Sequence, residues 1–195
     1  MLWVLFVFGA EGFIARMQSS LFDTRQVQDE PIRCVLPELT ARSVFETPLG
    51  WMEAVSDESS LLSLGFCRVD RGLRECVGNP VGSRVMGQLE EYFDGRRQDF
   101  DLPMRLLGTP FQVRVWKNLR QVPFGTTVCY SELAERLGVK NGQRAVGMAN
   151  RVNPVAIVVP CHRVIQADGQ LCGYAGGLWR KQQLLGLESG QRGLF

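Results

Sequence analysis

Hydrophobic residues recur at helical spacing just past the middle of the chain, in residues 109–125. The apolar positions that share one helical face are Phe111, Val115, Leu119 and Val122. Thr109 is placed to cap the helix, Pro110 has a backbone angle preset for the first helical position, and Gln112 completes a capping box. The pattern predicts a helix that begins after Thr109 and ends at Pro123.

Two shorter helical patterns follow, in residues 130–138 and 142–152. Two helices joined by a short turn with glycine form the outline of a helix-turn-helix, although many helical hairpins share it. The second pattern combines small residues with flanking arginines, namely Ala145, Gly147, Ala149, Arg144 and Arg151. Small residues allow close packing against another helix, and they equally allow a thin cationic helix to enter a nucleic-acid groove. The pattern leaves both readings open.

The first half of the chain shows a different pattern. In residues 43–69 short apolar runs alternate with turn-forming residues, which predicts two or three antiparallel strands. Residues 82–95 predict a helix capped by Ser83 and stopped by Gly95.

A β-branched run over residues 155–159 predicts a buried strand. Pro160 breaks it, so Cys161 and His162 fall on a turn at the strand's end. His162 is the only histidine in the chain, and an imidazole near a thiol is a common way to generate a nucleophilic thiolate. Adjacent side chains usually point apart, so this pair is weak evidence of catalysis by itself.

Composition is that of an ordinary globular protein, with 45% hydrophobic and 22% charged residues. The net charge of +2 conceals an asymmetry. Residues 1–107 carry 11 Lys/Arg against 16 Asp/Glu, whereas residues 108–195 carry 11 against 4. The basic half indicates either a solvated basic face or a polyanionic partner.

Six cysteines without any C-x-x-C spacing do not form a disulfide or zinc pattern, so we expect reduced, intracellular thiols. One histidine also argues against a zinc site of mixed ligands, and we expect no metal. The apolar run at residues 1–10 is shorter than a membrane helix and lacks a basic n-region. We therefore expect residues 1–42 to be a poorly ordered extension and expect no membrane partner.

Several motifs together resemble one known family. They are GTPFQVRVW, VPFGTTVCYSELAERLG, RAVGMANRVNP, VPCHRVI, LCGYAGG and KQQLLGLE, in this order between residues 108 and 188. The combination is similar to the methylated-DNA–protein-cysteine methyltransferases, also called O6-alkylguanine-DNA alkyltransferases. PCHR with a downstream GYAGG is the most specific part of the resemblance.

The resemblance implies an α+β fold. A small N-terminal antiparallel-sheet domain, ribonuclease H-like, is expected at residues 43–105. A mainly helical C-terminal domain with a DNA-binding helix-turn-helix is expected at residues 106–195. The implied activity is a suicide methyltransferase that moves an alkyl group from O6-alkylguanine, and from O4-alkylthymine, to its own Cys161.

The resemblance also implies roles for individual residues. Cys161 is the alkyl acceptor, His162 acts on it through a water molecule, and Glu188 orients His162. Tyr130 assists the leaving guanine and contacts DNA, and Asn153 is a hinge beside the DNA-reading helix. The implied DNA contacts are Arg144, Ala145, Gly147 and Arg151, with Arg144 as a finger that replaces the extruded base. The implied pocket residues are Val159, Pro160, Tyr174, Ala175 and Gly176.

No cofactor is expected, because no glycine-rich phosphate loop with its lysine occurs. The expected partner is double-stranded DNA, bound in the minor groove by a monomer in a bacterial cytoplasm or a eukaryotic nucleus. Two other functions remain open: a non-catalytic protein that binds alkyl lesions, and a cysteine hydrolase that uses Cys161, His162 and Glu188.

Overall fold

The computed structural model describes residues 40–68 and 79–190. Residues 1–39, which make up most of the expected extension, lie outside the described residues. The elements are β1 (Ala41–Thr47), β2 (Gly50–Ser56), β3 (Leu61–Phe66), α1 (Pro80–Phe93), α2 (Pro110–Leu119), β4 (Val128–Cys129), α3 (Tyr130–Arg136), α4 (Gln143–Arg151), the 3₁₀ turn η1 (Cys161–Arg163), β5 (Val164–Ile165) and α5 (Leu178–Glu188).

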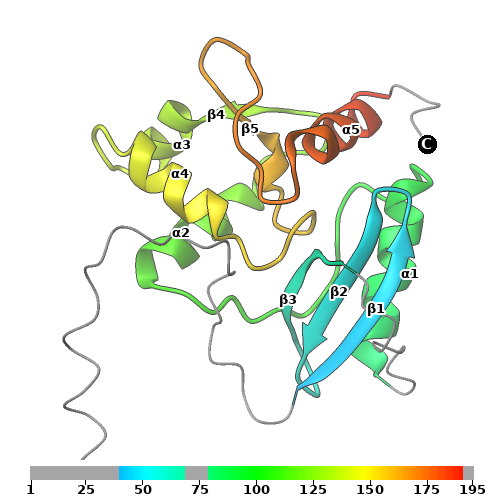
Figure 1. Ribbon diagram of the computed structural model, residues 1–195. Helices are drawn as coiled ribbons and strands as arrows, with labels where there is room; N and C mark the ends of the chain where they lie inside the picture. Colours follow the sequence, from blue (N-terminus) through cyan, green and yellow to red (C-terminus); the bar gives the residue numbers. More distant parts are fainter. Residues whose placement is uncertain (1–39, 69–78, 191–195) are drawn as a thin grey trace, which may run out of the picture. The chain divides into compact units, whose positions relative to one another are not determined.

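The first three strands form an antiparallel sheet in the order β1-β2-β3, and α1 packs against β1 and β2 (Figure 1). This confirms the predicted strands and the α+β class. The sheet begins at Ala41, two residues before the expected domain boundary. Gly50 has a φ of +106°, which suits glycine at the tight turn between β1 and β2.

The predicted cap of α1 was wrong. Asn79, not Ser83, caps the helix: its side chain accepts a hydrogen bond from the Val81 amide at 3.2 Å, and Pro80 occupies the first turn. Ser83 lies inside the helix, where its hydroxyl donates to the Asn79 carbonyl. An asparagine directly before a proline was the stronger start signal.

The capping box at α2 is confirmed. Thr109 Oγ1 accepts from the Gln112 amide at 3.3 Å, and Gln112 Oε1 accepts from the Thr109 amide at 2.8 Å. The helix ends at Leu119, earlier than predicted, so Val122 is buried just beyond it.

Helix α2 supports both helices of the helix-turn-helix, α3 and α4. The Trp116 indole donates to the Ala149 carbonyl of α4 at 2.8 Å, and Arg114 donates to the Leu137 carbonyl after α3 at 2.7 Å. Gly138 follows with a φ of +70°, as expected for a glycine that closes a helix.

The edge of β3 joins the two halves of the chain. The Leu61 amide donates to the Pro103 carbonyl, and Leu64 exchanges hydrogen bonds with Pro154 and Ala156 at 2.8 and 2.7 Å. Residues 154–156 lead directly towards Cys161. The N-terminal sheet therefore anchors the backbone that carries the candidate nucleophile.

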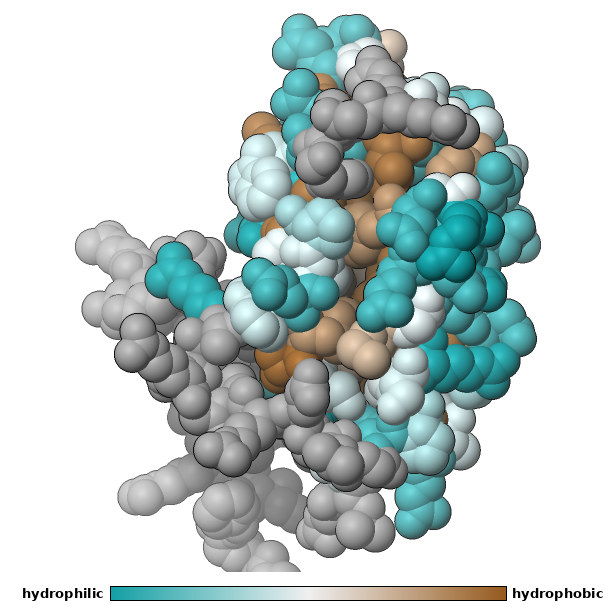
Figure 2. Space-filling view, turned by 90° about the vertical axis from the view of Figure 1, so that its right-hand side faces the viewer, coloured by the Kyte–Doolittle hydropathy of each residue, from teal (hydrophilic) through white to brown (hydrophobic). Residues whose placement is uncertain are grey.

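The face shown in Figure 2 has a band of hydrophobic residues between hydrophilic flanks. Across the described surface, the large hydrophobic side chains with substantial exposure are Trp51, Met86, Met148, Leu178 and Trp179. Among the helices of the described residues, none combines the length and the apolar character that crossing a bilayer requires.

We predict that Thr109→Ala destabilises the protein by about 1 kcal/mol, because the Gln112 amide loses its cap. The measurement is urea unfolding, with Thr109→Ser as the control that keeps a capping hydroxyl. Equal stability of the two variants would contradict the capping assignment.

Candidate active site

The backbone before Cys161 forms two tight turns, so the predicted strand at residues 155–159 was wrong although its residues are largely buried. The Val158 amide donates to the Ala156 carbonyl across Ile157, and the Cys161 amide donates to the Val159 carbonyl across Pro160, both at 2.8 Å. Ile157 has a φ of +68°, a strained conformation for a β-branched residue. These turns, together with the hydrogen bonds of Leu64 to Pro154 and Ala156, prevail over the strand propensity of this run.

Asn153 holds these turns and the thiol together. Its Nδ2 donates to the Val159 carbonyl at 2.8 Å and to Cys161 Sγ at 3.0 Å, and its Oδ1 accepts from the Val155 amide at 3.1 Å. Asn153 follows α4 by two residues. It thus links the end of the candidate DNA-reading helix to the sulfur.

Cys161 begins the turn η1 and is buried. Burial raises the pKa of its thiol, while the Asn153 amide and the Lys181 ammonium lower it in part. The thiol is therefore neutral at rest and needs a base to become a nucleophile.

His162 is fully buried and its Nε2 lies 2.8 Å from Glu188 Oε1. Burial lowers the pKa of His162, and the Glu188 carboxylate opposes this only in part. The imidazole is therefore neutral at neutral pH. Its other nitrogen, Nδ1, is buried and has no hydrogen-bond partner among the described residues.

Glu188 is the most heavily bonded group of the site. It accepts from Arg163 at 2.8 and 3.0 Å, from the Tyr92 hydroxyl at 2.7 Å and from the Gly125 amide at 3.2 Å. Burial would raise the pKa of its carboxyl, but the hydrogen bonds from His162 and Arg163 and the charge of Arg163 hold that pKa at about 2. Glu188 is therefore ionised.

Arg163 and Tyr92 were missed by the sequence reasoning. The available signal for Arg163 was its place in the PCHR motif, directly after His162, but its burial and its pairing with Glu188 are visible only in the structure. Tyr92 belongs to α1 and lies 96 positions from Glu188, so no local pattern could connect them.

Tyr130 is half-buried at the start of α3. Its hydroxyl lies within 3.4 Å of the Cys172 thiol and 3.5 Å of Asn150 Nδ2, both of which act as donors to it. Burial, followed by the contact with Cys172, raises the pKa of Tyr130. The phenol stays protonated at neutral pH, with its own proton free for another acceptor. Asn150 also donates to the Cys161 carbonyl at 3.4 Å.

The other predicted pocket residues flank the same site. Val159 and Pro160 are buried immediately before Cys161, and Tyr174, Ala175 and Gly176 lie in the loop before α5. Lys181 in α5 is fully buried, and its ammonium donates to the Val164 and Cys172 carbonyls at 2.6 and 3.0 Å. Sequence reasoning missed this lysine as well.

The predicted DNA-contact residues other than Tyr130 lie on α4. Arg144, Ala145 and Arg151 are exposed, while Val146 and Ala149 point into the core. Within the described parts of the chain, neither Arg144 nor Arg151 forms an ion pair, so both cations are available to a ligand. Gly147 is half-buried, and a Cβ built there would contact the Tyr130 ring at 3.7 Å.

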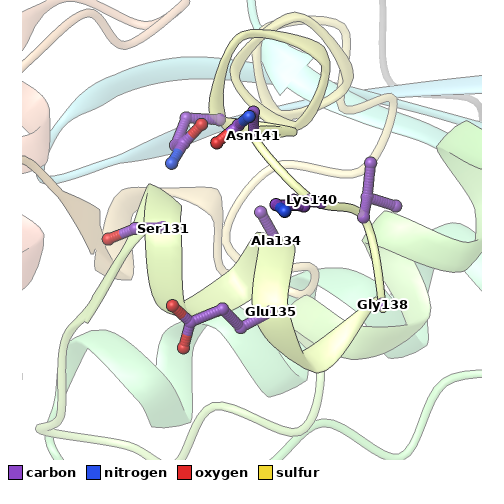
Figure 3. Close-up of a pocket in the computed structure, with 8 residues that line it drawn as sticks. Ser131, Ala134, Glu135, Gly138, Lys140 and Asn141 are labelled. Carbon is purple, nitrogen blue, oxygen red and sulfur yellow. The ribbon is translucent and has the colours of Figure 1, made fainter.

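A cavity of about 350 Å³ lies between α3 and α4 (Figure 3). It is lined by Ser131, Ala134, Glu135, Gly138, Val139, Lys140, Asn141 and Gln143. None of these residues belongs to the group around Cys161, so the cavity is separate from the thiol site.

Three buried polar atoms around Cys161 have no hydrogen-bond partner among the described residues: Asn150 Oδ1, His162 Nδ1 and the Tyr174 hydroxyl. Buried polar groups are normally paired, and exceptions occur where a ligand or water completes the site. Together with a thiol beside a His–Glu pair, they can bind a polar substrate and activate sulfur for attack.

Fold and site define a protein with an N-terminal antiparallel sheet and a buried cysteine–histidine–glutamate site behind a helix-turn-helix. The chain matches the 6-O-methylguanine DNA methyltransferase ribonuclease-like domain over residues 41–106 and the DNA binding domain of the same name over residues 110–190. The chain therefore belongs to the 6-O-methylguanine DNA methyltransferase family, and the resemblance seen in its motifs is confirmed.

Relatives agree with this assignment. A methylated-DNA–protein-cysteine methyltransferase of Methanosarcina acetivorans is 42% identical over 150 residues, which cover 75% of this chain and 96% of the relative. One from Mycolicibacterium paratuberculosis is 55% identical over 101 residues, which cover 52% of this chain and only 61% of that relative.

Solved structures are similar as well. Mycobacterium tuberculosis O6-methylguanine methyltransferase has 38% identity and a TM-score of 0.69, covering 80% of this chain and 96% of that one. The structure of Mycobacterium tuberculosis OGT in complex with DNA has 40% identity and a TM-score of 0.70, covering 77% and 93%.

We predict that Glu188→Gln destabilises the protein by roughly 3–5 kcal/mol at pH 7, because Arg163 is left buried without its counter-charge. The folded pKa of Glu188 is depressed from 4.5 to about 2. Its contribution is therefore fully present above pH 4.5 and is lost as the pH falls towards 2.

Urea unfolding at pH 7 and at pH 3 tests this, with the exposed Glu90→Gln as the matched control. The difference in unfolding free energy between Glu188→Gln and Glu90→Gln should be smaller at pH 3 than at pH 7. A Glu188→Gln variant as stable as the control at pH 7 would contradict the assigned role.

Proposed function

We propose that this chain repairs alkylated DNA by moving an alkyl group from O6 of guanine, and from O4 of thymine, to its own Cys161. The single observation that carries the proposal is the arrangement of the thiol. Cys161 Sγ is held at 3.0 Å by Asn153, in the turn that also carries the buried His162, which is paired with Glu188 of α5.

The proton path follows from the charges of the site. Glu188 is ionised, so His162 Nε2 carries a hydrogen and donates it to the carboxylate, which leaves Nδ1 as an acceptor. The Cys161 proton passes to Nδ1 through a water molecule. Glu188 then stabilises the imidazolium, as the orienting member of such groups does.

Transfer is a displacement at the alkyl carbon. The thiolate sulfur forms a bond to that carbon, the bond from carbon to O6 breaks, and its electron pair stays with guanine. Tyr130, protonated and with its hydrogen free, is placed to donate to the departing base. The product is a thioether without an activated carbonyl, so each molecule acts once.

DNA binding is assigned to α4. Its outward face carries Arg144 and Arg151, and its small residues suit the narrow minor groove. The lesion must leave the stack at a cost of a few kcal/mol, which Arg144 offsets by filling the gap. Cys161, His162 and Glu188 all come from one chain, which supports action as a monomer. Because the substrate is DNA, the compartment is a bacterial cytoplasm or a eukaryotic nucleus.

We predict that incubation with O6-methylguanine duplex DNA adds one methylene to Cys161 and saturates at one per chain, as measured by mass spectrometry. Cys161→Ala abolishes the gain but retains lesion binding. Binding by the wild type without any mass change would support a lesion-binding protein instead. Repeated turnover of acyl substrates would support a cysteine hydrolase.

We predict that Arg144→Ala slows repair of duplex DNA by roughly tenfold, since the extruded base then leaves an unfilled gap. Repair of the free base is unaffected, because no stack has to be opened. The readout is the single-turnover rate on both substrates, with the exposed Arg96→Ala as control. Equal slowing on duplex DNA and on the free base would contradict the assignment of Arg144 as the residue that fills the gap.

A further inference from the structure

The guanidinium of Arg180, in the first turn of α5, is enclosed by two aromatic rings. Its central carbon lies 4.4 Å from the centre of the Phe66 ring and 4.5 Å from that of Trp179. Phe66 is the last residue of β3, so this stack brings the N-terminal sheet to the start of α5. A planar guanidinium favours such contacts far more than an ammonium does.

The same guanidinium donates hydrogen bonds to two separate backbone segments. Its Nε donates to the Leu49 carbonyl in the turn between β1 and β2 at 2.8 Å, and its Nη1 donates to the Gly176 carbonyl at 2.7 Å. We call residues 174–177 the lip. Arg180 therefore ties the lip to the N-terminal sheet.

The lip packs closely against the N-terminal sheet. A Cβ built at Gly176 would lie 2.8 Å from Phe66 Cδ2 and 2.8 Å from Tyr174 Cε1. A Cβ at Gly50, whose φ is +106°, would lie 3.1 Å from Arg180 Nη2. Both glycines allow the backbone to approach this cluster closely.

We infer that Arg180 is a positioning residue that fixes the lip at one distance from Cys161, and that this setting determines how the protein discriminates between small and large alkyl groups. The inference rests on the proposed function, in which the lip forms one wall of the lesion pocket. Arg180 bonds the lip at the Gly176 carbonyl and is itself held by Leu49 and by two rings, so the lip keeps its position, whereas a loosened lip accommodates larger groups.

The lip also carries a residue that lies near Cys161. It carries Tyr174, whose hydroxyl is buried without a partner among the described residues. The pKa of that hydroxyl is raised well above its ordinary value, first by burial and then by the nearby Cys161, and is lowered in part by Arg180. A displacement of the lip therefore changes the surroundings of the sulfur.

The test uses Arg180→Lys, which keeps the positive charge but can neither stack as a plane nor reach both carbonyls in a fork. The first readout is hydrogen exchange of the Gly177 amide, which donates to the Tyr174 carbonyl at 2.9 Å and so reports opening of the lip. Exchange is expected to be about tenfold faster, the effect of losing one charge-assisted hydrogen bond. Unchanged exchange would overturn the inference.

The second readout is the rate of transfer to Cys161 from O6-benzylguanine and from O6-methylguanine in the same duplex. We expect the benzyl-to-methyl ratio to rise by about threefold to tenfold in Arg180→Lys, because discrimination by the wall is weakened. Arg84→Lys is the matched control, since Arg84 forms an exposed ion pair with Asp101 and should leave the ratio unchanged. A general loss of stability would slow both substrates alike and leave the ratio as it was.

Phe66→Leu is the second variant, because it keeps an apolar side chain but removes one ring from the stack, and it should shift the ratio in the same direction. A ratio that stays within twofold of the wild type in the folded variants overturns the role of Arg180. A wild type that takes no alkyl group from either substrate overturns the proposed function instead, so the two failures are distinguishable.

Discussion

The buried carboxylate of Glu188 is the constraint on which the rest of the site depends. It accepts hydrogen bonds from α1 through Tyr92, from the turn after Cys161 through His162 and Arg163, and from the backbone at Gly125. A carboxylate with 1% of its side chain exposed would be costly alone, but the Arg163 guanidinium offsets its charge. One charged pair thus fixes where three parts of the chain meet, and the histidine is oriented as a consequence.

Burial favours the neutral forms of both Cys161 and His162 in the resting site. It raises the pKa of Cys161 and lowers that of His162, so both groups are neutral before substrate arrives. In the proposed reaction, moving the proton from sulfur to imidazole creates two charges in a buried site. The Lys181 ammonium and the Asn153 amide stabilise the first, and Glu188 stabilises the second. A neutral resting thiol is also less reactive towards oxidants than a thiolate would be.

Sequence predicted those features whose causes are local. The capping box at Thr109 and the helix-turn-helix spacing depend on residues within a few positions of each other, and the structure has them as expected. The run at residues 155–159 was misread as a strand because its β-branched composition is local, whereas the β3 edge that bonds Pro154 and Ala156 is distant in the sequence. The motif resemblance pointed to Cys161, His162 and Glu188, but it assigned no role to Tyr92 or Lys181.

The N-terminal sheet bears on the site from two sides, and this gives it a mechanical role. On one side, Leu64 of β3 bonds Pro154 and Ala156, which hold the backbone just before the strained Ile157. A β-branched residue keeps a positive φ only where its surroundings determine it, and the β3 edge is part of those surroundings. On the other side, Phe66 of the same strand supports the lip through Arg180. The backbone that leads to Cys161 and the loop at residues 174–177 are therefore both connected to one strand, so a shift of β3 would affect both segments together.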